Sequence, residues 1–322
     1  MDHGFSLTAA LGDAFKEAGR EVDLEPLHCA IGLSLMVCGP VGEADVSNWA
    51  AYARDAFLVR GARLFGAEIR DVHPPEAARG LERSSEFEQH FDASYRPLIH
   101  NALHNGQSVL AWQGWGSDNE LAWGRVVGEC GDGVGLEGNV HAREGMRRVV
   151  MVRPAAQVYV VERIREVERD ANDLVMMMAD GARAVLENAV GERHGVVAGV
   201  AAYDAWMAAR ATMSKEEWVG ESRSLAESLV ASHGCAVRVL SECARGLRTD
   251  VKSVAESMLK LAEFVVEKLI HWVTQIEKGS DDAWGLCGDL MATLTSVREE
   301  SLLALEVLRL SACKVRGMSH AG

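Results

Sequence analysis

The sequence predicts an α+β protein with two domains, a small antiparallel sheet domain at residues 1–160 and an all-α helical bundle domain at residues 161–322. Within residues 107–138, apolar runs that contain tryptophan flank a polar loop, which is typical of a hairpin of buried strands. No proline occurs after Glu162, and the apolar residues there recur at steps of three and four. That spacing is typical of bundle helices.

Length and composition limit the class of protein. A single core stops growing at roughly 250 to 300 residues, so two domains are expected for a chain of 322 residues. The formal net charge of −14 opposes binding to nucleic-acid phosphates or to an anionic membrane. No apolar run reaches the roughly 18 residues that span a bilayer, and the N-terminus lacks the pattern of a signal peptide. We therefore expect a cytoplasmic protein of bacterial type, without nucleic-acid or membrane partners.

The sequence predicts neither a metal nor a cofactor. Its seven cysteines are odd in number, widely spaced and without a CxxC pair, so reduced thiols are expected. Glu263, Glu267 and His271 fall on one face of a predicted helix at metal-ligand spacing, but no matching set occurs on another helix. We interpret that face as solvated. The glycine-rich residues 131–135 lack the lysine and serine of a phosphate-binding loop and are interpreted as a turn.

The elements of the N-terminal half follow from short patterns. An apolar stripe over residues 6–18, ended by Gly19, predicts a covering helix. Residues 26–37 read as a loop that leads into a buried helix, with Cys29 near its first turn. Other elements are expected as a short helix at 45–52, a strand at 63–73, a helix at 81–104 and strands at 146–152 and 157–161.

The C-terminal half is predicted to contain four long helices and one shorter helix. Ser214 and Glu217 form a capping box, in which each side chain accepts a hydrogen bond from the other residue's backbone N–H. A helix is therefore expected to start there. The other helices are expected from Ile164 to Ala189, at 194–211, from Thr249, and after a cap at residues 280–282.

Cys29 is the most suggestive single side chain. A thiol in the first turn of a helix is stabilised as a thiolate by the helix macrodipole, and a thiolate attacks carbonyl groups. Free cysteine is also among the most buried residue types, so a structural role is the alternative.

The order of motifs resembles the papain-like cysteine peptidase superfamily. A loop, Cys29 and an apolar helix are followed much later by the strands VLAWQGW and AWGRVVGECGDG. The nearest branch contains bacteriocin-processing-type peptidases and butirosin-biosynthesis-type acyltransferases, which often add a helical C-terminal half. Some members carry a Gly-x-x-Ala-Tyr-x-x-Trp stretch there, and residues 199–206 match it. The resemblance covers roughly residues 20 to 210.

This resemblance implies that Cys29 is the nucleophile and that a histidine at the start of the second hairpin strand is the general base. The chain instead has LAWGR at residues 121–125, so the expected base is missing from that position. His100, His104 and His141 could fold back towards the thiol, and nothing in the sequence singles one out.

Five aromatic residues are candidates for lining a ligand pocket. Three come from the predicted hairpin and two from the C-terminal motif; they are Trp112, Trp115, Trp123, Tyr203 and Trp206. Tryptophans on neighbouring strands also pack against each other in hairpin cores, which is the alternative role for this set.

Three functions remain open from the sequence. The favoured one is a catalytically degenerate papain-like protein that binds a small molecule or a protein partner, because the base is missing. The second is a cysteine-dependent acyltransferase or amide hydrolase that uses Cys29. The third is a structural homo-oligomer, since long helices with apolar stripes could complete their burial against a second copy.

Overall fold

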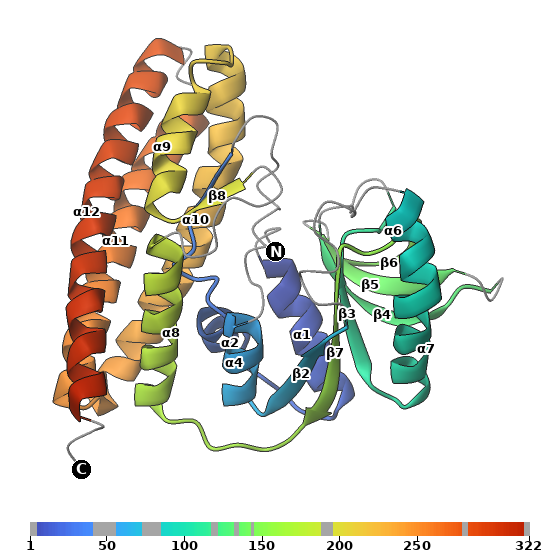
Figure 1. The fold of residues 1–322 in the computed structure, drawn as a ribbon. Coiled ribbons are helices and arrows are strands. Elements are labelled where there is room, and N and C mark those ends of the chain that lie inside the picture. The colour runs from blue at the N-terminus through green and yellow to red at the C-terminus, as the bar shows by residue number, and fades with distance from the viewer. Residues whose placement is uncertain are drawn as a thin grey trace. The chain divides into compact units, whose positions relative to one another are not determined.

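The structure contains a six-stranded antiparallel sheet and a group of long helices (Figure 1). The computed structural model describes residues 5–40, 56–72, 85–116, 122–131, 135–142, 145–187, 196–278 and 283–318. Residues 1–27 and 54–168 form one compact unit, the sheet unit, and residues 28–53 and 169–322 form the other, the helical unit. The helical unit thus includes an early segment, 28–53, which the predicted boundaries assign to the N-terminal domain.

The strands of the sheet lie in the order β2-β7-β3-β4-β5-β6, and each pairs antiparallel with its neighbours. In β3 and β4, Trp112 pairs with Trp123, so the predicted central hairpin is confirmed. β6 forms one of the two edges of the sheet, and its Met146 and Val150 are exposed. The strands are β2 (Ala67–Asp71), β3 (Ser108–Trp112), β4 (Trp123–Glu129), β5 (Leu136–Ala142), β6 (Gly145–Met151) and β7 (Gln157–Ile164).

Helices cover both faces of the sheet (Figure 1). On one face, α6 (Ser85–His90), a π-helical turn (Phe91–Tyr95) and α7 (Arg96–His104) pack their apolar side chains onto the strands. On the other face lies α1 (Ser6–Glu17), which confirms the predicted covering helix. Both faces of the central strands are therefore buried, which explains why they read as continuous apolar runs.

Three predicted elements of the sheet unit differ in length from the structure or lie partly outside the described residues. The predicted strand at 63–73 is shorter than expected, because residues up to Leu64 belong to α4 (Ala56–Leu64). The predicted helix at 81–104 is confirmed from Ser85, and its first residues lie outside the described part of the chain. The predicted helix at 45–52 and most of the turn at 131–135 lie outside the described residues as well.

The ring of Trp115 lies against two glycines on neighbouring strands. A Cβ atom at Gly138 on β5 would stand 2.5 Å from this ring, and one at Gly124 on β4 would stand 2.8 Å from it. Trp115 is only 1% exposed. Glycine in a strand interior often marks such a close approach, and here it makes room for the largest side chain type. The sequence pattern does not predict β5, because Gly138 follows a glycine-rich stretch that is typical of a turn.

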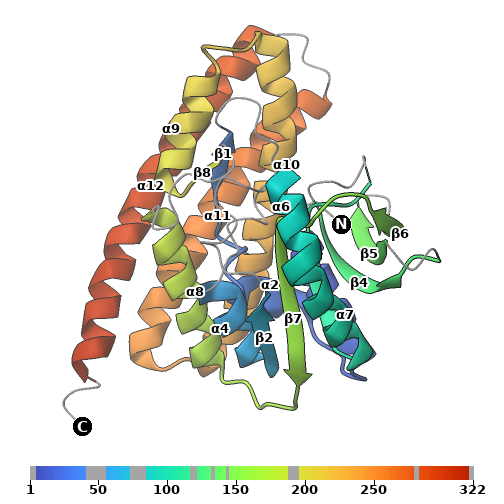
Figure 2. The ribbon, with the colours of Figure 1, turned by 45° about the vertical axis from the view of Figure 1, so that its right-hand side comes forward.

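Long helices make up most of the helical unit (Figures 1 and 2). Those in mutual contact are α8 (Ala171–Leu186), α10 (Lys215–Cys243), α11 (Thr249–Glu277) and α12 (Ala283–Met318). The capping box of Ser214 and Glu217 at the start of α10 is confirmed, as is the start of α11 at Thr249. Among the described helices, none combines the length and apolar character that a membrane span requires.

Two helix starts differ from the prediction because strands occupy the expected first turns. Ile164 ends β7, where it pairs with Ala67 of β2, so α8 starts only after the cap residue Asp170. The predicted helix at 194–211 is preceded by β8 (Val196–Ala198), which pairs with β1 (Cys38–Pro40). Gly199 then takes a φ of +74°, and α9 (Val200–Ala209) follows.

Two histidines are buried in the core of the helical unit. His28 Nε2 lies 3.1 Å from Ser232 Oγ, which donates its own proton to the carbonyl of Leu33 at 2.8 Å. His28 Nε2–H is therefore the donor. His233 Nδ1 lies 3.0 Å from the carbonyl of Leu229. Burial lowers the pKa of His28 to about 3 and the pKa of His233 to about 4.

The glycine beneath Trp115 gives a first prediction. We expect Gly138→Ala to lower the free energy of unfolding by about 1 to 3 kcal/mol, because the added methyl group forces the indole or the strand to move. Gly128→Ala on β4 is the matched control, since its Cβ would meet nothing within 4 Å. Urea unfolding curves measure both variants. Equal midpoints for the two would contradict this packing.

The buried histidines give a second prediction. Between pH 6.5 and about 3, the unfolded chain binds a proton at His28 that the folded chain does not bind, so stability falls as the pH drops through this range. The slope is about 1.4 kcal/mol per pH unit for each such histidine. We expect His28→Gln to remove roughly one histidine's share of the slope between pH 6 and pH 4. A slope for His28→Gln equal to that of the unmodified chain refutes the assignment.

Candidate functional site

Cys29 lies at the end of a short helix instead of at the start of a long one. α2 spans Leu24–Ala30, so the predicted helix within residues 26–37 is wrong. The N–H of Gly32 donates to the carbonyl of Cys29, and the N–H of Leu33 donates to the carbonyl of His28. With Gly32 at a φ of +82°, these two bonds form a Schellman motif, which ends the helix.

The surroundings of Cys29 differ from those of an activated thiol. Its side chain is 0% exposed, so reagents in solution do not reach the sulfur atom in the folded state. The last turn of a helix carries the negative end of the macrodipole, which disfavours a thiolate where the predicted first turn would favour one.

Trp123 opens β4, at the position where the resemblance implies a histidine. Its backbone N–H donates to Ser6 Oγ at 3.1 Å, and Ser6 is the first residue of α1. Ser6 is 2% exposed, so this contact is buried. The start of β4 therefore lies next to the start of α1. The sequence pattern does not single out Ser6 as a site residue, since serine is common at helix starts.

Acidic side chains of α1 attach this helix to the sheet. His141 Nε2 on β5 lies 2.7 Å from Asp13 Oδ2. Farther along α1, Glu17 Oε2 accepts from Arg125 at 2.5 Å and from Ser108 at 2.7 Å. The carboxylate of Asp13 thus holds the imidazole of His141 towards α1.

The other two candidate histidines lie on the helix that covers the opposite face of the sheet. His100 Nδ1 on α7 lies 2.6 Å from Glu129 Oε1, which ends β4. His104 is the last residue of the same helix and is exposed. Both of these positions are in the sheet unit, whereas Cys29 belongs to the helical unit.

The three hairpin tryptophans are packed into the core of the sheet unit. The rings of Trp112 and Trp123 stack with centroids 6.4 Å apart, and Trp123 stacks on Tyr159 at 5.8 Å. Trp115 lies against the glycines described above, on the face that α6 and α7 cover. Each of the three tryptophans is 1% exposed, so their packing closes the space between the strands and the helices.

The two aromatic residues of the C-terminal motif are packed in the helical unit. Trp206 Nε1 donates to Ser222 Oγ of α10 at 2.7 Å, and Trp218 Nε1 donates to the carbonyl of Trp206 at 3.1 Å. Tyr203 is 0% exposed, and burial raises the pKa of its hydroxyl group, which keeps it neutral. These residues join α9 to α10.

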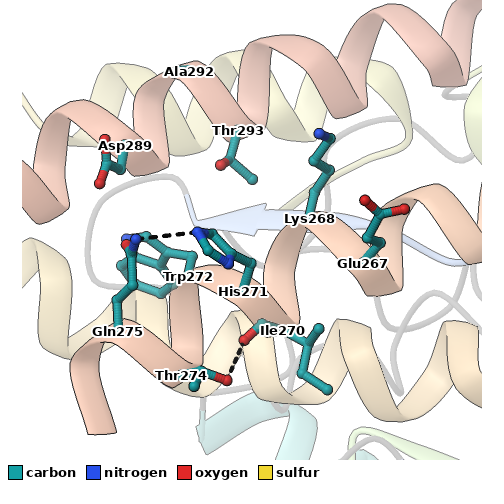
Figure 3. Close-up of a pocket in the computed structure, with 10 residues that line it drawn as sticks. All are labelled: Glu267, Lys268, Ile270, His271, Trp272, Thr274, Gln275, Asp289, Ala292 and Thr293. Atoms are coloured by element: carbon teal, nitrogen blue, oxygen red, sulfur yellow. Dashed lines mark hydrogen bonds between the residues drawn. The ribbon is translucent and has the colours of Figure 1, made fainter. Parts of the chain in front are cut away.

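A groove lies in the helical unit between α11 and α12 (Figure 3). Its volume is about 830 Å³. Trp272 Nε1 donates to the carbonyl of Leu286 at 3.0 Å, which fixes the base of the groove by tying α11 to α12. Trp272 itself is 1% exposed, whereas its neighbour Ile270 is 48% exposed. A buried tryptophan and an exposed isoleucine of α11 therefore both line the groove.

Polar side chains from both helices border the groove (Figure 3). Glu267, His271 and Gln275 come from α11, while Asp289 and Thr293 come from α12. The Gln275 amide nitrogen lies 3.2 Å from His271 Nε2. Because the amide donates, His271 Nε2 accepts and the imidazole proton lies on Nδ1.

Part of this groove was visible in the sequence as the face formed by Glu263, Glu267 and His271. Glu267 and His271 border the groove and are exposed, as expected of a solvated face. Among the described residues, no group of three or more His, Cys, Asp or Glu side chains could hold a metal ion. Asp289 was not singled out, because its place opposite α11 depends on how the two helices pack.

Comparisons with known proteins leave the function to be argued from this geometry. No protein-family model matches the chain, and no curated protein matches it. The features that bear on function are the buried thiol of Cys29 and the groove between α11 and α12.

Proposed function

We propose that this chain is a catalytically degenerate papain-like protein that binds a small ligand, and that the groove between α11 and α12 is the binding site. The observation that carries the proposal is the complete burial of Cys29 at the C-terminal end of α2. A nucleophilic thiol has to meet its substrate and has to be held as a thiolate. Burial keeps a substrate away from the thiol of Cys29, and the C-terminal end of α2 disfavours the thiolate.

The papain-like part of the proposal rests on the order of sequence motifs. Trp123 stands where the resemblance implies the general base, and the residue beside its backbone N–H is Ser6. Tryptophan cannot accept a proton from a thiol, since its indole N–H only donates. A chain with this substitution is better suited to binding than to acyl transfer.

The groove has the size of a small-molecule site. Ligand sites commonly measure about 300 to 1,000 Å³, with an apolar lining and a few converging polar groups. The groove of about 830 Å³ lies within this range. Trp272, Ile270 and Ala292 are its apolar lining residues, and the other seven lining residues are polar or charged.

Alkylation of Cys29 tests the loss of catalysis. We expect iodoacetamide at pH 8 to leave Cys29 unmodified in the folded protein and to modify it in urea, because its side chain is 0% exposed. Cys130, which is partly exposed, serves as the internal reference in the same mass spectrum. If Cys29 reacts faster than Cys130 in the folded protein, the cysteine-dependent acyltransferase or hydrolase becomes the better function.

A variant with a blocked groove tests ligand binding. We expect a panel of organic cations, organic anions and neutral metabolites to contain compounds that raise the melting temperature of the protein, since binding to the folded state stabilises it. Ala292→Trp should remove this shift, because Ala292 is an exposed residue of the groove. Glu299→Trp, at an exposed position of α12 beyond the lining residues, is the control. Equal shifts in both variants, or no shift with any compound, would exclude the groove as the site.

A further inference from the structure

We draw no further inference here: the strongest candidate, the exposed apolar stripe of Leu303, Val307 and Leu310 on α12, carries nothing, because nothing in the described part of the chain shows what covers it.

Discussion

The hydrogen bonds around Gly32 decide what kind of site Cys29 can form. They end α2 by a left-handed turn, so the chain leaves the helix immediately after the thiol. Ser232 of α10 then joins the two sides of this turn, since it accepts from His28 and donates to the carbonyl of Leu33. A buried polar group that is fully hydrogen-bonded fixes a unique arrangement, because breaking one bond leaves its partner unsatisfied in the core. The same bonds hold in place the segment that contains the buried thiol of Cys29.

The sequence predicted those parts of the fold that local chemistry determines. The capping box at Ser214 and Glu217 specifies a helix start from adjacent residues alone, and the structure has it. The hairpin of β3 and β4 could be predicted because β3 and the start of β4 are buried and therefore apolar. These signals need no knowledge of distant contacts.

The rest depends on contacts between residues far apart in the chain. Glycine is typical of turns, yet Gly138 lies within β5. The ring of Trp115 occupies the space that a side chain at Gly138 would take. Gly32 lies in an apolar run that resembles a buried helix, and only its backbone bonds show that the helix has ended. In the candidate site, Glu267 was identified from its helix face, whereas Asp289 joins it only through the packing of α12 on α11.

The exposed outer strand of the sheet has a consequence for self-association. A strand at the edge of a sheet offers unpaired backbone groups to another chain, and the exposed side chains of Met146 and Val150 on β6 would favour such pairing. Arg147 and Arg148 lie between them at the centre of this strand. Charged side chains at the centre of an edge strand oppose its pairing with another chain, so these arginines limit the growth of this edge into a continuous sheet.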